Sequence, residues 1–365
     1  MIYLDNAATS YPKPRSVITE VNRCIKQYCG NPGRSSHVLS VKSAEKIYEA
    51  REVIANHFNL SNPENVVFTP NATYALNLAI KTMIPNNCHV LCSDFEHNSV
   101  IRPLKKLEKT CGVVYSCFSS AEEIPRLIRP QTHVIVCSLA SNVTGQTHDL
   151  DIISKICKQN NLILIVDASQ IVGHQKINLA LSSCDAFCAP GHKSLFGIQG
   201  SGFIIFKNGT RGESFIEGGS GTESSSYDMP MYLPEGYEAG TLSTPSIVSL
   251  AKGIKYIEEV GISNIKSYLD GLTDRLFEQL SENEGLNIYG MGCGILSFNL
   301  RDYKSTFIAS ELSKRGICVR GGLHCAPSIH KKLGTLDQGA VRVSFSYFNR
   351  KRDVDIFCKA LKEIK

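Results

Sequence analysis

An acidic and a basic side chain follow two neighbouring apolar runs in the middle of the chain. Asp167 comes at the end of "LILIVDA" (162–168), and Lys193 lies in the glycine-rich segment "CAPGHKSLFGIQGSG" (188–202). In open α/β sheets, ligands bind in the crevice beyond the carboxyl ends of the strands. A lysine that forms a Schiff base and a carboxylate that keeps a pyridine nitrogen protonated are the two groups that pyridoxal phosphate (PLP) needs. Each residue alone also has a simpler explanation, Asp167 as a helix cap and Lys193 as a surface charge.

The start of one expected helix offers the backbone N–H donors that a phosphate group needs. The segment "NATYALN" (71–77) directly follows the apolar run "NVVFTP". The N–H groups of Ala72 and Thr73, together with the Thr73 hydroxyl, would attract an anion to this helix start. Helix capping explains Asn71 and Thr73 about as well.

A thiol is the third candidate group. The segment "RGGLHCAP" (320–327) places Cys325 on a glycine-rich loop, and a reactive cysteine acts as the thiolate. Arg320 and His324 are candidates for the positive charge that stabilises a thiolate. Most of the other thirteen cysteines fall in apolar strand or helix patterns, where packing as small hydrophobes explains them. Cys293, in "GMGCGI", is the only other cysteine in a flexible setting.

The elements that must position these groups follow an α/β pattern. Between about residues 60 and 210, short apolar runs alternate with amphipathic stretches, which predicts a mostly parallel sheet flanked by helices. From 243 to 283 two long helices are expected, broken near Gly261. The predicted strands of the sheet are residues 89–93, 113–118, 133–140, 162–168, 185–189 and 202–206.

Two lobes are expected from this pattern. A large domain would take residues 15–254, and a smaller α+β domain would combine an N-terminal arm, residues 1–14, with residues 255–365. The segment 208–240, rich in Gly, Ser, Tyr and Pro, is predicted to be a long loop. Loops of such length within compact proteins are usually functional.

Composition excludes several classes of protein. The chain has 365 residues, of which 42% are hydrophobic and 20% charged, as in ordinary globular proteins. Its 39 basic and 34 acidic side chains are well mixed, so no basic stripe indicates nucleic-acid or membrane binding. No apolar run approaches the ~20 residues that span a bilayer, and no secretory signal is seen, so a cytoplasmic protein is expected. Cys and His show no zinc-type spacing, so no metal site is expected.

The candidate groups belong to a longer series of motifs. Through them the chain resembles the class V aminotransferase group of fold-type I PLP enzymes, and within it the cysteine desulfurases and selenocysteine lyases with a short catalytic loop. The resemblance implies a large PLP-binding domain with a mostly parallel central sheet, plus a smaller C-terminal α+β domain. The motifs are "YLDNAAT" (3–9), "NPGRSSH" (31–37), "NATYALN" (71–77), "EHNS" (96–99), "SNVTG" (141–145), "VDASQ" (166–170), "GHKSLFGIQG" (191–200), "EAGT" (238–241), "RGGLHCAP" (320–327) and "VRVSFSYFN" (341–349).

The resemblance implies a role for each matching residue of a cofactor site. Lys193 would form the Schiff base, Asp167 would pair with the pyridine nitrogen, and Gln170 would donate to the ring hydroxyl. His97 would stack on the ring, although a histidine that begins a helix is often only a cap. Asn142 would lie near the ring hydroxyl and the substrate amine, although Asn is also common in turns for local reasons. The phosphate contacts would come from Ala72, Thr73 and His192, and from Gly240 and Thr241 of the partner subunit in a homodimer.

The resemblance also implies a reaction. Arg342 would bind the substrate α-carboxylate in the bidentate manner of a guanidinium, although a surface ion pair explains an arginine equally well. L-Cysteine would become L-alanine, and Cys325 would keep the sulfur as a persulfide for an acceptor protein of unknown identity. A selenocysteine lyase acting on L-selenocysteine, a C–S β-lyase and a class V aminotransferase remain alternatives on the same scaffold. A PLP-free, cysteine-rich metal-binding or redox protein is a more distant one.

One position departs from the family pattern. The residue three before the lysine is often Ser or Thr and donates a hydroxyl to the phosphate, whereas here it is Pro190. Proline has neither a hydroxyl nor a backbone N–H. The loop "EGGSGTESS" (217–225) offers hydroxyls and amides that would compensate.

Overall fold

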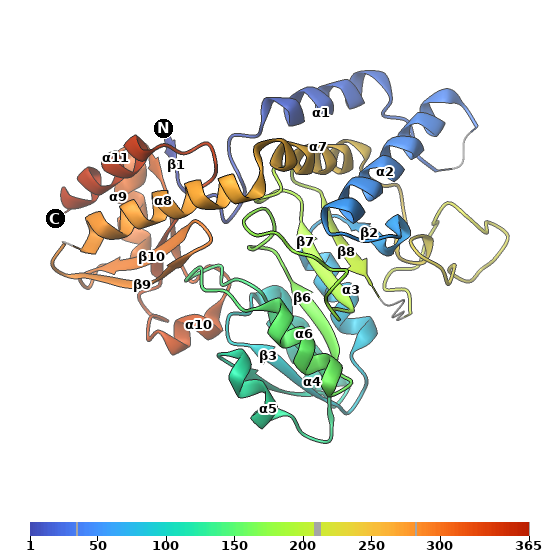
Figure 1. Ribbon diagram of the computed structural model, residues 1–365, viewed down its shortest axis with the longest axis horizontal. Helices are drawn as coiled ribbons and strands as arrows, with labels where there is room; N and C mark the ends of the chain where they lie inside the picture. The colour runs from blue at the N-terminus through green and yellow to red at the C-terminus, as the bar shows by residue number, and fades with distance from the viewer. Residues whose placement is uncertain (34–35, 208–212, 282, 365) are drawn as a thin grey trace.

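A seven-stranded sheet forms the centre of the larger part of the molecule. The computed structural model describes residues 1–33, 36–207, 213–281 and 283–364 (Figure 1). The strand order is β2-β8-β7-β6-β5-β3-β4. The strands are β2 (Val66–Thr69), β3 (His89–Ser93), β4 (Val114–Phe118), β5 (Thr132–Ser138), β6 (Ile163–Asp167), β7 (Ala186–Pro190) and β8 (Gly202–Phe206).

The sheet is mostly parallel, as the sequence predicts. Strands β7, β6, β5, β3 and β4 pair in parallel, whereas β8 runs antiparallel to both β2 and β7. All six predicted strands are present, with limits that differ from the predicted ones by two residues at most. Because parallel strands point the same way, their carboxyl ends meet at one edge of the sheet.

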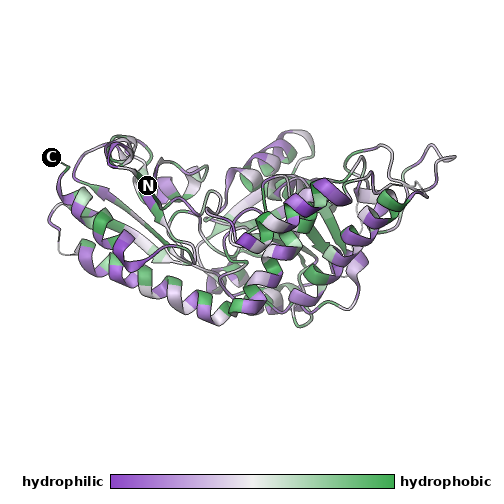
Figure 2. Ribbon diagram, turned by 90° about the horizontal axis from the view of Figure 1, so that it is seen from above, coloured by the Kyte–Doolittle hydropathy of each residue, from purple (hydrophilic) through white to green (hydrophobic). Residues whose placement is uncertain are grey.

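Helices cover both faces of this sheet (Figures 1 and 2). Alternate strand residues face opposite layers, so Val90 packs with the layer of α3 and α4, and Leu91 packs with the layer of α2, α6 and α7. Figure 2 shows hydrophobic residues along the central strands and on the inner sides of many helices. The helices of this part are α1 (Arg15–Gln27), α2 (Val38–His57), α3 (Ala72–Met83), α4 (Asn98–Thr110), α5 (Ile124–Leu127), α6 (Leu150–Gln159) and α7 (Thr244–Val260).

A second, antiparallel sheet lies in the C-terminal part of the chain. Its order is β12-β13-β10-β9, and a separate two-stranded sheet pairs the N-terminal strand β1 with β11. The chain start therefore packs against the C-terminal elements (Figure 1). The elements are β1 (Ile2–Tyr3), α8 (Ile262–Ser281), β9 (Leu286–Gly292), β10 (Ile295–Leu300), α9 (Ser305–Lys314), β11 (Ile317–Cys318), β12 (Arg320–Gly322), α10 (Pro327–Lys332), β13 (Ala340–Ser344) and α11 (Lys351–Lys362).

Two long helices connect the sheets. Ser243 is the N-cap residue of α7, and Gly261, with φ +88°, separates α7 from α8, which confirms the predicted break. A positive φ is one that glycine adopts without strain. The expected domain boundary after residue 254 falls inside α7, and the domain limits stay a prediction.

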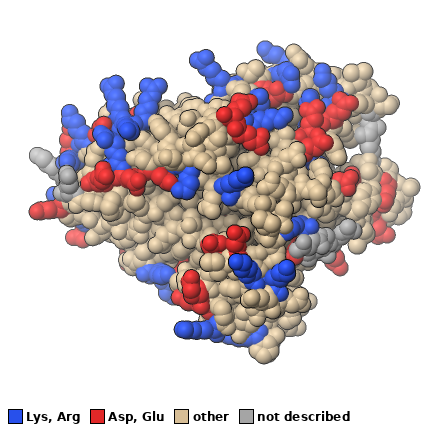
Figure 3. Space-filling model, in the orientation of Figure 1, with Lys and Arg blue, Asp and Glu red and all other residues tan. Residues whose placement is uncertain are grey.

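The predicted long loop is irregular over most of its length. Residues 208–212 lie outside the described residues, and from 213 to 240 the chain forms only one short 3₁₀ turn, Glu235–Tyr237. Basic and acidic side chains are interspersed on the face shown in Figure 3. None of the helices in the described ranges is both long and apolar enough to cross a membrane.

A buried ion pair fastens the end of this loop to the large sheet. Arg51 of α2 pairs with Glu238, and each side chain is 6% exposed. Arg51 also donates to the carbonyl of Val66, and Glu238 accepts from the N–H of Phe68, so both groups hold the start of β2. A buried charge pair is tolerated when its remaining hydrogen bonds are satisfied in this way.

Replacing Glu238 by glutamine is expected to lower the free energy of unfolding by about 3–5 kcal/mol, because Arg51 would stay buried without a counter-charge. Urea unfolding followed by circular dichroism measures this change. Asp355→Asn, which breaks the exposed pair with Arg275, is the control and should cost at most about 1 kcal/mol. Equal effects of the two substitutions would contradict the buried role of Glu238.

Candidate active site

A pocket of about 210 Å³ opens where the parallel strands end. Ser138, Asp167 and Pro190 are the last residues of β5, β6 and β7, and all three line it. Most of the predicted site residues meet here, although they come from distant parts of the chain. The pocket is lined by Ala7, Ala8, Asn71, Ala72, Thr73, Leu76, Phe95, His97, Ser99, Ser138, Ala140, Asn142, Asp167, Ser169, Gln170, Pro190, His192, Lys193, Arg320, His324 and Arg342.

Asp167 and Lys193 lie in the same pocket, as expected from their places after neighbouring strands. Asp167 is buried, and its Oδ1 accepts a 2.9 Å hydrogen bond from the N–H of Ser169. Burial lowers the pKa of Lys193 to about 8. The carboxylate of Asp167 raises this pKa, whereas the positive charges of Arg342 and Arg320 lower it further. An amine with this pKa loses or gains a proton close to neutral pH, as a nucleophilic or acid–base lysine must.

The N-terminal arm holds the segment that carries Lys193. Ser10 Oγ donates to the backbone carbonyl of Lys193 at 2.8 Å, and Lys13 Nζ donates to the carbonyl of His192, also at 2.8 Å. Thr9 Oγ1 donates to the same His192 carbonyl at 3.0 Å. These bonds fix the turn that presents the lysine, so the first residues of the chain belong to the site.

The start of α3 faces the pocket and is capped by Asn71, whose Oδ1 accepts from the N–H of Tyr74 at 3.1 Å. Asn71 therefore caps the helix, and the predicted anion site at the same helix start stays a prediction. Gly202 of β8 packs directly beneath it, where a Cβ atom would lie 2.6 Å from the carbonyl carbon of Asn71. Only glycine allows the two backbones to approach so closely. The Thr73 hydroxyl lies 2.8 Å from the hydroxyl of Ser99.

His97 is the N-cap residue of α4, and its stacking on a cofactor ring stays a prediction. Its Nδ1 accepts from the N–H of Ser99 at 3.1 Å, which caps the helix, and the ring also lines the pocket. Burial lowers the pKa of His97 to about 4, so the imidazole is neutral at physiological pH. A neutral ring can stack on an aromatic ligand without placing a charge against it.

Several buried polar atoms in this pocket lack partners within the described chain. Of ten such side-chain atoms, four belong to pocket residues. Buried polar groups are normally satisfied, so unpaired polar atoms that gather in one pocket are typical of a ligand-binding site. The four atoms are Asn142 Oδ1, His192 Nδ1, His324 Nδ1 and Arg342 Nε. The amide nitrogens of two pocket residues do have partners. Asn142 Nδ2 donates to the carbonyl of His324 at 2.8 Å, and Gln170 Nε2 donates to the carbonyl of Ala7 at 3.1 Å.

Arg342 lies in the pocket wall, but it is not simply free to bind a carboxylate. Its Nη2 pairs with Asp5 Oδ1 at 2.8 Å, and its Nη1 donates to the carbonyl of Asn142 at 2.9 Å. The side chain is 1% exposed, so the surface ion pair considered as an alternative is excluded. Arg320 lies opposite Arg342 in the β12–β13 register and also lines the pocket. Two guanidinium groups therefore face the same space.

Cys325 is exposed on a turn and is not among the residues that line this pocket, whereas the residue before it, His324, does line it. His324 and Cys325 have φ values of +51° and +57°, which are uncommon for residues other than glycine. The N–H of Asn98, the residue after His97, donates to the Cys325 carbonyl at 2.7 Å. Cys325 is exposed, and a negative charge on its sulfur would raise the pKa of Lys193. The structure thus places Cys325 next to the pocket that contains Lys193, and its catalytic role stays a prediction.

The charges near this thiol differ in part from the expectation. His324 is buried, and burial together with the charge of Arg342 lowers its pKa well below the usual range. Its Nε2 lies 2.9 Å from the carbonyl of Ala340. His324 is therefore neutral and turned toward β13, and it brings no positive charge to Cys325. Arg320, which lines the pocket, is the positively charged residue of the segment 320–327.

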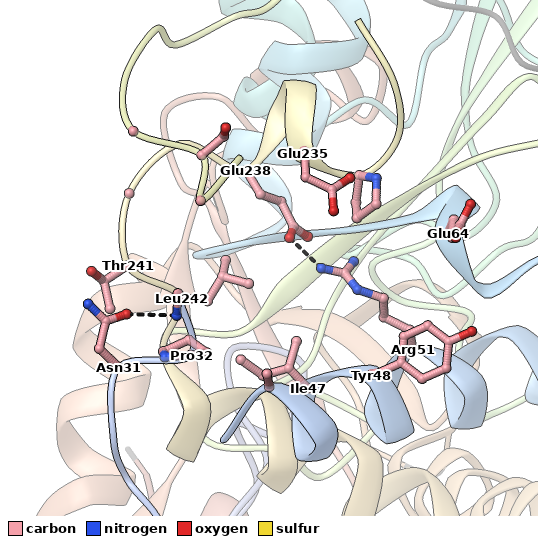
Figure 4. Close-up of a pocket in the computed structure, with 17 residues that line it drawn as sticks. Asn31, Pro32, Ile47, Tyr48, Arg51, Glu64, Glu235, Glu238, Thr241 and Leu242 are labelled. Carbon is pink, nitrogen blue, oxygen red and sulfur yellow. Dashed lines mark hydrogen bonds and ion pairs between the residues drawn. The ribbon is translucent and has the colours of Figure 1, made fainter. Parts of the chain in front are cut away.

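Gly240 and Thr241 do not line this pocket. They border a larger cavity of about 570 Å³, between α2 and the loop that ends in Glu238 (Figure 4). Figure 4 shows the Arg51 and Glu238 side chains pointing toward each other in its wall. Gly219, Ser220 and Gly221 also border this cavity. The loop 217–225 therefore does not supply the hydroxyl that Pro190 lacks within the same chain.

Sequence reasoning missed several residues of the site. Ser99 and Phe95 line the pocket, as does Ser138, and none was assigned a role. Glu96 is fully buried, and its Oε1 accepts from Ser93 Oγ at 2.6 Å and from the N–H of Ser138 at 2.7 Å. Burial raises the pKa of Glu96 to about 8. The motif "EHNS" contained both Glu96 and Ser99, but only the fold gives them partners.

Comparison with known proteins agrees with this geometry. The family model for class V aminotransferases matches residues 2–357. Probable cysteine desulfurases from Methanothermobacter thermautotrophicus and Pyrococcus abyssi are 30% and 31% identical, each over 100% of this chain and 94% of its own length. The apo structure of a cysteine desulfurase from Thermococcus onnurineus NA1 superposes with a TM-score of 0.93 at 29% identity, covering 100% of this chain and 94% of that one. The relatives compared with it are named as cysteine desulfurases or probable cysteine desulfurases, and the chain belongs to the class V aminotransferase family.

Proposed function

We propose that this chain is a PLP-dependent cysteine desulfurase that converts L-cysteine to L-alanine and keeps the sulfur on Cys325 as a persulfide. The observation that carries the proposal is the exposed Cys325, which directly follows a lining residue, His324, of the pocket that contains Lys193 and Asp167. An aminotransferase needs the lysine and the acid but has no use for the thiol. The full-length relationship to cysteine desulfurases supports the same activity.

The pocket residues fit PLP. Lys193 would hold it covalently, Asp167 would pair with its ring nitrogen, and His97 would stack on its ring. Asn142 Oδ1 and His192 Nδ1 have no partner within the described chain. The ring hydroxyl of PLP would donate to Asn142 Oδ1, and its phosphate would bind His192 Nδ1. When bound, PLP supplies an electron sink that stabilises negative charge next to the amino-acid nitrogen. The other contacts would come from Ala72, Thr73 and Gln170.

Ser99 is the residue that best replaces the hydroxyl missing at Pro190. It lines the pocket, and its Oγ lies 2.8 Å from Thr73 Oγ1 and 2.9 Å from His97 Nδ1. Two hydroxyls at the starts of α3 and α4 therefore stand together, near the partial positive charge of two helix ends. They would bind the phosphate in place of a residue at position 190.

Arg320 and Arg342 would bind the α-carboxylate of L-cysteine. The Nε of Arg342 has no partner within the described chain, whereas Asp5 occupies its Nη2. Arg320 adds a second cation opposite it. A carboxylate placed between the two would gain charge-assisted hydrogen bonds and turn the substrate sulfur toward Cys325.

Cys325 would act as the nucleophile. Its thiolate attacks the substrate sulfur, the carbon–sulfur bond of the substrate breaks, and Cys325 retains the sulfur as a persulfide. The substrate carbon takes up a proton, for which Lys193 is suitably placed and has a suitable pKa. The products are alanine and the enzyme persulfide, which an acceptor protein or a reductant would discharge.

A second copy of this chain would cover the cavity of Figure 4. The two segments that form it carry exposed apolar side chains in the single chain: Val38, Leu39 and Tyr48 of α2, of which Tyr48 borders the cavity, and Met231 of the loop. Exposed apolar patches of this kind usually mark contact surfaces. Gly240 and Thr241 border the cavity, so a homodimer would let them reach the phosphate of the partner subunit's site. The fourteen free thiols fit a reducing compartment such as the cytoplasm.

Incubation of the purified protein with PLP and L-cysteine tests the proposal. Alanine and sulfide are expected in equal amounts with dithiothreitol present, and Cys325 should gain the mass of one sulfur atom without it. Transfer of the amine to a keto acid would instead indicate an aminotransferase. Cleavage of selenocysteine that does not need Cys325 would indicate a selenocysteine lyase.

The uptake of PLP by the cofactor-free protein is expected to depend on pH. Only neutral Lys193 can attack an aldehyde, and with a pKa of about 8 its neutral fraction rises about tenfold between pH 7 and pH 9. Stopped-flow absorbance measures the uptake rate, with acetyl-lysine amide as a reference amine. Asp167→Asn removes a charge that raises this pKa, so the midpoint should move to lower pH. A midpoint near that of the reference amine would contradict the buried setting of Lys193.

A further inference from the structure

Two cysteines of the large sheet lie in contact outside the proposed active site. Cys92 of β3 and Cys117 of β4 are register partners on parallel strands, and their sulfur atoms are 3.6 Å apart. Neighbouring strands are about 4.8 Å apart, within the range of Cα separations that a disulfide allows. The two thiols are therefore on backbone positions that a disulfide can join, with their sulfur atoms already in contact.

The two thiols differ in access to solvent. Strand β4 is the edge strand of the sheet, and Cys117 is exposed on it. Cys92 is fully buried in the layer between the sheet and helices α3 and α4. An oxidant from solvent can thus reach Cys117 first, and Cys92 can react only through Cys117.

The local charges support the same order. The hydrogen bond with Cys92 lowers the pKa of Cys117, with Lys105 acting in the same direction and burial and Asp94 opposing it. The same bond, together with burial, holds the pKa of Cys92 well above its usual range. Cys92 therefore holds its proton more tightly than Cys117 does. Thiolate character and exposure are the two properties that make a cysteine sensitive to oxidation.

We propose that Cys117 and Cys92 form a redox-active dithiol that hydroperoxides oxidise to a reversible disulfide. The Cys117 thiolate attacks one peroxide oxygen, the O–O bond breaks, and Cys117 becomes a sulfenic acid while hydroxide leaves. The Cys92 thiol then attacks the Cys117 sulfur, its proton leaves with the hydroxyl as water, and the disulfide forms. Peroxide is reduced by two electrons, and the dithiol is oxidised by two.

This site is separate from the proposed desulfurase chemistry. Neither cysteine lines the pocket of Lys193, and the reaction needs neither PLP nor Cys325. Strained or exposed disulfides are the easily reduced ones. A bond across adjacent strands at a sheet edge belongs to that class, so thiol reductants would restore the dithiol.

Peptide mass spectrometry after brief exposure of the full-length protein to hydrogen peroxide tests the site. Free thiols are alkylated before tryptic digestion. The peptides of Cys92 and Cys117 should appear joined, with a mass about 2 Da below their reduced sum, and the joined species should disappear after dithiothreitol. Both peptides alkylated as in the untreated protein, or Cys117 joined to a different cysteine, would overturn the proposal.

Three variants assign the order of events. Cys92→Ser should leave Cys117 without a resolving thiol, so peroxide should drive it to sulfinic and sulfonic acids. Cys117→Ser should leave Cys92 reduced, because it is buried. Cys111→Ser, a change in the same tryptic peptide as Cys117, is the matched control and should leave the joined species unchanged. Oxidation of Cys92 in the Cys117→Ser protein would contradict the relay, and circular dichroism verifies that each variant is folded.

Discussion

Lys193→Ala is expected to lower the formation of alanine from L-cysteine by about 10³-fold or more. Lys193 is the one amine that lines the pocket with Asp167 in the described chain, and its lowered pKa suits both covalent attachment of the cofactor and proton transfer. Alanine cannot perform either task. Coupled detection of alanine measures the loss, and the visible absorbance of bound PLP should be lost with it.

Two further substitutions separate chemistry from folding in this experiment. Lys193→Arg keeps a positive charge in the pocket but not a titratable amine, so it should be about as inactive as the alanine variant. Lys155→Ala changes an exposed lysine of α6 and should retain full activity. Substantial turnover by Lys193→Arg would show that only the charge is needed, and would refute the assigned role.

Cys325→Ala is expected to reduce desulfuration by about 10²-fold or more while PLP stays bound, because Lys193 and the other pocket residues are untouched. Cys325 is exposed next to the pocket residue His324, and its backbone carbonyl accepts from the N–H of Asn98. Its loss should therefore remove the sulfur acceptor and nothing else. Alanine release and persulfide formation on the intact protein are the two measurements.

Cys293→Ala is the matched control for that variant. Cys293 also has a positive φ, but burial raises its pKa to about 12, so it stays protonated and should be dispensable. Unchanged desulfuration in Cys325→Ala would exclude Cys325 as the acceptor. Loss in both variants would indicate that the thiol transfer needs Cys293 as well.

The elements of the fold could be predicted from local patterns. Apolar runs mark the buried strands, and the series of strand and helix implies a parallel sheet with its carboxyl ends together. Asp167 and Lys193 follow two such strands, so their meeting needed no information beyond the order of the elements. Gly261 likewise marks the break between α7 and α8 by its type alone.

The contacts within the site could not be predicted in the same way. Ser99 touches Thr73, 26 residues away, and Arg342 pairs with Asp5, 337 residues away. Such contacts depend on which side chains the packed elements turn inward, and neither periodicity nor spacing encodes that. For the same reason, the sequence predicted a positive charge on His324 beside Cys325. In the structure His324 is buried, and burial keeps its ring neutral.

The sequence by itself therefore determined the family, the order of the elements and the residues that bear chemistry, because these are written in local residue types. The tertiary structure decided which of them meet. It placed Arg320 beside Arg342 on paired strands, left Cys325 exposed next to the pocket residue His324, and put Gly240 and Thr241 in the wall of a different cavity. It also brought Cys92 and Cys117 into contact. Each of these outcomes depends on long-range packing, in which the burial of apolar surface fixes the positions of polar side chains that do not drive folding themselves.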